Sequence, residues 1–326
     1  MSRSPGATVG GQAVMEGVMM RAPSSWAVAC RRPDGSIITQ RNELPHLTGQ
    51  SRLRRIPFIR GILVLIESLS LGFRALSWSA IQSGAEDEDE LSRAQVIGTM
   101  IFAVVVAVGL FILLPAFAAD YLKGFVSDSS FAFVILDGIL RIALIVAYIW
   151  AISRSKEIRR VFQYHGAEHK TIHAYENGDP LTIEAIQGYS PRHPRCGTSF
   201  ILIVAMVAFF VFLTLAPLPF LWQVLARIVL IPVIAGLSYE LLKVGANKRW
   251  MSWANRPGIW LQRITTKEPS DDMVEVAVAS LLTALSEDEL ADVEGRGPIV
   301  AAALAAEREG SEQSDAPTDV EEPADG

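Results

Sequence analysis

The sequence predicts a mainly α-helical protein that crosses a membrane four times and carries a small β-containing region near its N-terminus. Half of the 326 residues are hydrophobic and the mean hydropathy is +0.31, a balance that is unusual for a soluble domain of this length. Long uncharged apolar segments recur along the chain, and segments of this length span a bilayer as helices. A Pro-Asp-Gly turn signal at 33–35 separates two short runs of β-forming residues, which is typical of a hairpin.

The N-terminal part is expected to fold outside the membrane. Residues 1–9 are predicted to be disordered, and residues 25–41 to form the hairpin. The preceding segment, 10–23, reads as a further strand interrupted by Gly17, so residues 10–45 together predict a small β-rich region. Its paired glycines also permit another part of the chain to approach closely.

Four segments are predicted to span the membrane, and the first of them contains no charged residue. Their ranges are 95–119, 131–153, 198–216 and 220–243. Residues 56–84 also have a helical apolar pattern, but Arg60, Glu67 and Arg74 interrupt it. This segment is therefore expected to be an amphipathic helix that lies on the membrane or packs against the helix bundle.

Basic residues predict the orientation. They cluster before the first span, between the second and third, and after the fourth: Arg52, Arg54, Arg55 and Arg60; Arg154, Lys156, Arg159, Arg160 and Lys170; Lys243, Lys248 and Arg249. Four spans place all three clusters on one side, which the positive-inside rule assigns to the cytoplasm. Both termini, the β-rich region, the loop 154–197 and an amphipathic helical region over 247–294 are then cytoplasmic. The acidic tail, 305–326, is predicted to be disordered.

Composition also limits the partners. The net charge is −6, and no segment combines basic and aromatic residues as nucleic-acid-binding proteins do. Membrane lipid is the expected partner, while a protein partner at the cytoplasmic face and a homo-oligomer are left open. The two cysteines, Cys30 and Cys196, lie far apart in sequence and indicate no disulfide framework.

The stretch "YHGAEHKTIH" (164–173) holds three of the five histidines. In a helix, His165, His169 and His173 lie on one face, one turn apart. The order His-x-x-Glu-His is the inverted zinc-protease motif, in which both histidines bind the ion and the glutamate is the general base. The stretch therefore predicts a divalent metal site, best suited to zinc, with Glu168 as the catalytic residue. A polar juxtamembrane helix without metal is the alternative.

A metal site needs at least one more ligand, and three candidates are available. Glu240 is expected near the cytoplasmic end of the fourth span, at the depth of the loop. His173 continues the same helix face, and Cys196 follows His193 in a His-x-x-Cys pair just before the third span. For Glu240, a carboxylate that is hydrogen-bonded or reaches the membrane surface is the alternative.

Three charged residues are predicted within the spans and away from their ends. Asp137 and Arg141 are four residues apart and can pair within one helix, and Arg227 lies in the fourth span. Such residues mark a transport path or form a self-neutralised structural cluster. The spacing favours the structural cluster, which we expect also to include Arg227.

Five long strings carry a resemblance to a known family: "GGQAVMEGVMMR" (10–21), "RGILVLIESLSLG" (60–72), "YHGAEHKTIHAYE" (164–176), "HPRCGTSF" (193–200) and "PSDDMVEVAVASL" (269–281). Through them the chain resembles the bacterial YqhQ-like family of membrane proteins, over about residues 8–285. The resemblance implies a multi-pass protein of the bacterial plasma membrane. The family is one of unknown function, and its label as a predicted metal-dependent enzyme adds no support for a metal that is independent of the histidine-glutamate motif.

Together these features predict a metal-dependent hydrolase with its site on the cytoplasmic face of the membrane. A non-enzymatic membrane scaffold or regulator is the main alternative. A small transporter, built on Asp137, Arg141 and Arg227, is the third.

Overall fold

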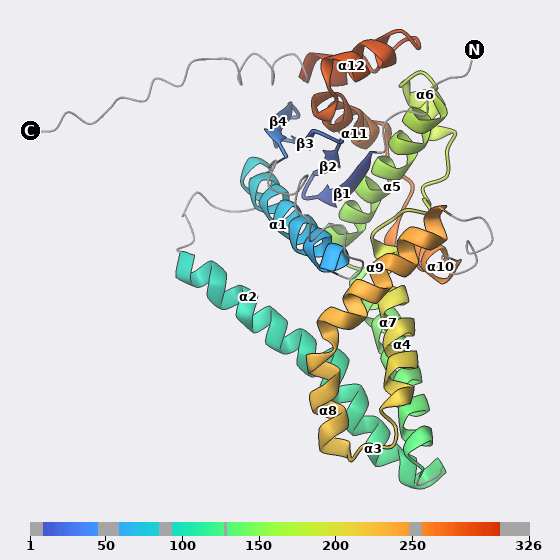
Figure 1. Ribbon diagram of the computed structural model, residues 1–326. Coiled ribbons are helices and arrows are strands. Elements are labelled where there is room, and N and C mark those ends of the chain that lie inside the picture. Colours follow the sequence, from blue (N-terminus) through green and yellow to red (C-terminus); the bar gives the residue numbers. More distant parts are fainter. Residues whose placement is uncertain (1–8, 45–58, 85–92, 127–128, 248–255, 307–326) are drawn as a thin grey trace, which may run out of the picture.

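The computed structural model describes residues 9–44, 59–84, 93–126, 129–247 and 256–306. The fold is mainly helical, with one antiparallel sheet near the N-terminus. The sheet and its covering helices form one end of the molecule, and the apolar helices extend away from it (Figure 1). Most of the two segments predicted to be disordered, 1–9 and 305–326, lies outside the described residues. Their described residues belong to the fold, since Val9 is buried and 301–306 is helical.

The sheet is a four-stranded meander of β1 (Gly10–Val14), β2 (Gly17–Arg21), β3 (Ser25–Arg31) and β4 (Ile37–Glu43). The Pro-Asp-Gly sequence makes the turn between β3 and β4. Asp34 accepts a hydrogen bond from the Ser36 amide, and Gly35 adopts a φ of +88°, which glycine tolerates better than other residues. Gly17 begins β2 and does not break a strand, because the turn falls at residues 15 and 16.

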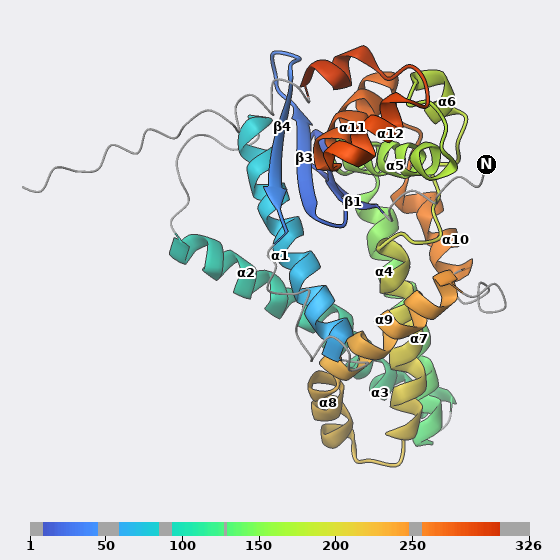
Figure 2. The same ribbon diagram turned by 45° about the horizontal axis from the view of Figure 1, so that its top comes forward.

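Helices cover both faces of the sheet. Side chains point alternately to the two faces along each strand, so each face contributes its own set of core residues. One face packs against α5 (Lys156–Asn177) and α11 (Asp271–Ala284) through Val18, Met20, Ala27 and Ala29. The other face packs against α1 (Ile59–Gln82) through Met19, Trp26 and Val28. Figure 2 shows the resulting sandwich, with α1 on one side of the sheet and α5 and α11 on the other.

Helix α1 was expected to lie on the membrane or to pack against the helix bundle, and in the structure it packs on the sheet and against α9. Leu71 and Ala75 pack on the sheet. Glu67, within the helix, forms a 2.6 Å ion pair with Arg21 of β2. Arg60 likewise pairs with Glu240 of another helix, so two of the three charged residues that suggested a surface helix are partners of other elements of the fold.

Three helical stretches of the described chain are long and apolar enough to span a membrane: Arg60–Gln82, Ile101–Phe125 and Phe131–Ile152. They indicate a membrane protein. The second stretch runs through α2 (Arg93–Val108), the π-helical segment η3 (Gly109–Leu113) and α3 (Leu114–Val126), and the third is α4 (Ser130–Ile152). Helix α7 (Thr198–Thr214) is apolar but shorter.

The span predicted over 220–243 is bent. It consists of α8 (Phe220–Val229) and α9 (Ile231–Asn247), which meet at 54° and together would make a fourth span. Pro232 in the first turn of α9 explains the bend, because proline lacks a backbone N–H and clashes with the carbonyl four residues earlier.

The region predicted as amphipathic helices over 247–294 contains α10 (Arg256–Thr265), α11 and α12 (Glu287–Glu294). Helix α11 is not amphipathic: from Met273 to Ala284 every residue except Glu275 is buried. The reason is that it packs on the sheet beside α5, and Val293 of α12, Ala303 and Ala306 belong to the same core. The segment 154–197, predicted as a loop that holds the motif, contains α5 and the short helix α6 (Ile183–Gln187).

Candidate metal centre

Helix α5 carries the histidine motif, as the one-turn spacing predicted. Every residue from Tyr164 to Tyr175 except His173 is buried. Tyr164, Ala167 and Tyr175 belong to the main core beside the sheet. The opposite side of α5 faces the segment 188–197 and the connection between α10 and α11, from which the site's other groups come.

Two histidines and one cysteine come together beside α5. The ligand atoms of His165, His169 and Cys196 all lie within 4.8 Å of one another. The Nε2 atom of His165 is 3.1 Å from the Cys196 sulfur. All three side chains are buried, with exposed fractions of 8%, 2% and 5%. This is the group of three that the motif required, with Cys196 as the third member.

Backbone carbonyls orient both imidazoles. The Nδ1 atom of His165 is 2.8 Å from the Thr265 carbonyl oxygen, and that of His169 is 2.7 Å from the Pro191 carbonyl oxygen. Since a carbonyl only accepts, each Nδ1 carries the proton, and Nε2 of a neutral ring is left with a lone pair. Metal-binding histidines usually have such an outer partner.

The Nε2 atom of His169 provides the strongest support for a metal site. It is buried and has no hydrogen-bond partner within the described chain. Buried polar atoms of side chains are nearly always hydrogen-bonded, because desolvation without compensation costs about 1–3 kcal/mol. An ion held jointly with His165 and Cys196 would satisfy this atom.

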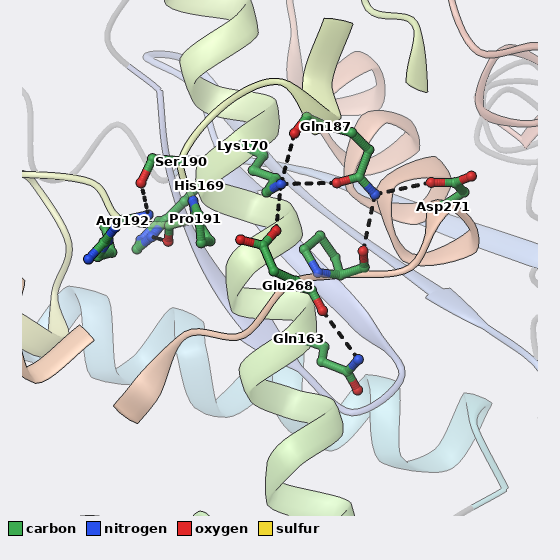
Figure 3. A network of polar contacts seen from close by, with 10 residues as sticks. Gln163, His169, Lys170, Gln187, Ser190, Pro191, Arg192, Glu268 and Asp271 are labelled. Carbon is green, nitrogen blue, oxygen red and sulfur yellow. Dashed lines mark hydrogen bonds and ion pairs between the residues drawn. The ribbon is translucent and has the colours of Figure 1, made fainter. Parts of the chain in front are cut away.

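A polar network holds the surrounding segments against α5 (Figure 3). The buried Lys170 ammonium donates to the backbone and side-chain oxygens of Gln187 at 3.0 Å, and forms a 2.6 Å ion pair with Glu268. Gln187 in turn donates to the Pro269 carbonyl and to Asp271. These bonds link α5 and α6 to the start of α11, next to the chain that supplies the Thr265 carbonyl.

Burial sets the protonation of the ligands. It holds the pKa of His169 well below its usual range, so this ring is neutral, as a ligand must be. Burial also raises the pKa of the Cys196 thiol, although hydrogen bonds from Thr198 and Ser199 oppose the shift. Binding a metal through Cys196 would therefore release a proton.

Glu168 lies one residue before His169 and points toward β1. It is 4% exposed, and its Oε2 atom has no hydrogen-bond partner within the described chain. Burial raises the pKa of this carboxyl to about 8. A Cβ at Gly11 would lie 2.8 Å from the Glu168 Cγ, so glycine at this point of β1 leaves the space that Glu168 occupies.

Two of the predicted ligands are not brought into the group. Both Glu240 carboxylate oxygens bind the Arg60 guanidinium of α1, at 3.1 and 2.5 Å, so Glu240 is an ion-pair partner and its assignment as a ligand is corrected. His173 lies further along α5, where its Nε2 is 3.0 Å from the Arg192 carbonyl and its ring stacks on Tyr189.

His193 is a fourth histidine of the neighbourhood. Its ring centroid is 4.5 Å from that of His173 and 5.7 Å from that of His169.

The groups that hold the histidines in place could not be recognised in the sequence. Two are backbone carbonyls, which any residue provides, and Gln262, which bonds both the amide and the carbonyl of His193, comes from distant α10.

Buried His193 predicts an acid-sensitive fold. Burial lowers its pKa to about 4. Its carboxylate neighbour Glu176, at 3.6 Å, is already paired with Arg195, so this carboxylate does little to retain the proton on the imidazole. Between pH 6.5 and 4 the unfolded chain binds a proton that the folded chain does not, so stability falls as the pH falls. We expect a loss approaching about 3 kcal/mol at pH 4.

This pH dependence is measured by denaturant unfolding of chelator-treated protein over that range. His193→Gln should reduce the change in the free energy of unfolding with pH. His173→Gln, at the more exposed neighbour, should reduce it less. A wild-type protein whose stability rises as the pH falls would contradict the assignment of acid sensitivity to His193.

A family model described as a protein of unknown function, DUF1385, matches residues 56–287. The chain belongs to this family. The matched range contains all of α5 and Cys196, so the metal-ligand group lies within the DUF1385 region. The uncharacterized protein YqhQ of Bacillus subtilis (strain 168) is 37% identical over 299 residues, which cover 85% of this chain and 94% of that protein. This confirms the resemblance to the YqhQ-like family, and no solved structure matches the chain.

Proposed function

We propose that this DUF1385 protein is a membrane metalloprotein in which His165, His169 and Cys196 bind a divalent ion. The observation that carries the proposal is the buried, unpartnered Nε2 of His169 beside the other two ligand atoms. Imidazole and thiolate together favour zinc, because magnesium and calcium prefer oxygen ligands.

The proposed reaction is hydrolysis of a peptide or lipid-linked bond near the membrane. Three protein ligands would leave a fourth coordination position open, and a zinc ion held by them would supply Lewis acidity to a substrate carbonyl or to water. Glu168 is the proposed general base. Its carboxylate would accept a proton from the attacking water and pass it to the leaving group. Glu168, the proposed base, lies between the two histidine ligands, His165 and His169, on α5.

The topology is part of the proposal. The four proposed spans are α2 through α3, α4, α7, and α8 with α9 counted as one, while α1 is not counted. They place the basic clusters and the metal centre on the cytoplasmic side of the plasma membrane of a bacterium. Both termini then also lie in the cytoplasm. Membrane lipid surrounds the spans, and a protein partner or a second copy at the cytoplasmic face is compatible with this arrangement.

A structural ion in a non-enzymatic scaffold or regulator is the second candidate, and the burial of all three ligands favours it. Cobalt substitution separates the two. In a catalytic site, added azide would change the visible spectrum of the bound cobalt, because an open position accepts it. In a closed structural site the spectrum would stay the same.

Metal content tests the site itself. Full-length protein is purified in detergent with a tag free of histidine, and its metals are measured by elemental mass spectrometry. We expect about one equivalent of zinc per chain, and less than about one tenth of that in His169→Asn and Cys196→Ser, which each lose one of three ligands.

Two matched controls accompany these variants. His173→Asn alters a neighbouring histidine of the same helix, and Cys30→Ser alters the other buried thiol. Both should retain the metal. Zinc that survives in folded His169→Asn, or a wild type that binds no divalent ion when each is offered, would contradict the proposal.

A further inference from the structure

Three charged side chains meet among the apolar helices, far from the metal centre in sequence. The Arg141 Nη2 atom lies 3.0 Å from both carboxylate oxygens of Asp137, within α4. The Nη1 atom of Arg227, in α8, lies 3.0 Å from the same carboxylate. All three are buried, with exposed fractions between 1% and 8%. The pairing expected from the sequence is present, and it includes Arg227.

The charges in this cluster do not cancel. Two guanidinium groups share one carboxylate, so the cluster carries a net charge of +1 in a candidate membrane span. A buried net charge in a membrane is costly. The rings of Phe133 and Phe212 lie 5.1 and 4.9 Å from the Arg227 guanidinium, and such contacts offset only part of the cost.

Arg227 also has unused donors. Its Nε and Nη2 atoms are buried and have no hydrogen-bond partner in the part of the chain that the structure describes. Two other acids of the apolar helices have partners of their own, since Glu240 pairs with Arg60 and Asp120 with Lys123. An anion from outside the chain would use these donors and balance the charge.

A pocket of about 360 Å³ opens beside the two arginines. Its wall combines apolar side chains of η3, α4, α7 and α9 with Arg141 and Arg227, and includes Phe111, Ile145, Phe200 and Phe212. This volume is at the small end of the range for ligand pockets, which is roughly 300–1,000 Å³. The exposed wall of the pocket is almost wholly apolar, and the guanidinium groups of Arg141 and Arg227 lie buried beside it.

We propose that this pocket binds a single-chain lipid anion, a long-chain carboxylate, with its oxygens on Arg227 and Arg141 and its chain along α7. The apolar wall disfavours a small hydrated anion, and the single net charge matches one carboxylate. The modest volume favours one aliphatic chain over the two chains of a phospholipid. This site is separate from the metal centre and is tested independently of it.

The probes are palmitate and hexadecanol, which share an alkyl chain and differ in charge. Each is added to the full-length protein in neutral detergent, and the bound fraction is read by native mass spectrometry. We expect palmitate to bind at least about tenfold more than hexadecanol, because hydrogen bonds to charged groups contribute that much. Arg227→Gln should reduce palmitate to the level of hexadecanol.

Three further variants keep the test decisive if Arg227→Gln folds poorly. Arg227→Lys keeps the charge and should keep the preference. Ala205→Phe fills the pocket and should reduce binding of both probes. Arg154→Gln removes an exposed guanidinium at the end of α4 and should change nothing.

Equal binding of palmitate and hexadecanol would overturn the proposal, as would a palmitate preference that persists in folded Arg227→Gln. A two-chain acidic phospholipid that co-purifies at one per protein and resists displacement by palmitate would show that the single-chain assignment is wrong.

Discussion

Removing the metal ion with a chelator is expected to lower the unfolding temperature of the protein by about 10 °C. An ion that binds only the folded chain stabilises it by about 4 kcal/mol at a thousandfold excess over its dissociation constant. In a chain of this size each kcal/mol corresponds to roughly 2–4 °C. Tryptophan fluorescence during heating, with zinc and then with chelator, measures the shift in the full-length protein in detergent.

The ligand variants test whether this shift comes from loss of the bound ion. In His169→Asn the chelator should have no effect, because the ion is already absent, whereas His173→Asn should show the full shift. An unfolding temperature that stays constant in wild-type protein, after elemental analysis has verified removal of the ion, would contradict a metal that is coupled to the fold.

Alanine in place of Gly166 is expected to destabilise the protein by about 1–2 kcal/mol. The added Cβ would lie 2.0 Å from the Lys267 carbonyl oxygen. That segment cannot easily move away, because the Lys267 amide donates to the Phe162 carbonyl of α5 at 2.9 Å. Overpacking of this kind outweighs the gain of about 1 kcal/mol that alanine brings to a helix. Thermal and denaturant unfolding measure the loss.

The same substitution should also weaken metal binding. Displacing the Lys267 segment moves the nearby Thr265 carbonyl, which orients His165, and loss of an outer partner typically costs 10–100-fold in affinity. Gly197→Ala is the matched control, since it lies beside Cys196 and its Cβ would meet nothing within 4 Å. If both variants were equally stable and held equal metal, the close contact at Gly166 would be unimportant.

Local features of the chain could be predicted from the sequence because their causes are local. The Pro-Asp-Gly turn, the long apolar helices and the one-turn spacing of His165 and His169 each depend on neighbouring residues alone. The same holds for the pairing of Asp137 with Arg141 in one helix. Where a local pattern was ambiguous, as for the charges of residues 56–84, the surrounding fold decided how the helix is used.

The third metal ligand could not be chosen from the local sequence. Glu240, His173 and Cys196 were all candidates in the sequence, and each has the right chemistry. Arg60, which is 180 residues away from Glu240, binds that carboxylate, while the Arg192 carbonyl and Tyr189 hold His173. Only Cys196 reaches the two histidines, because the fold brings the start of α7 beside α5.

The sequence by itself determined that this is a mainly helical membrane protein with a small sheet and a His-x-x-Glu-His helix, because hydropathy and periodicity act over one or two turns of chain. Only the tertiary structure decided that Cys196 completes the ligand group, that carbonyls of Thr265 and Pro191 orient the imidazoles, and that Arg227 brings an extra charge to Asp137. The physical reason is the same in each case. These contacts join residues distant in sequence, and packing, not local pattern, chooses among partners of equal chemistry.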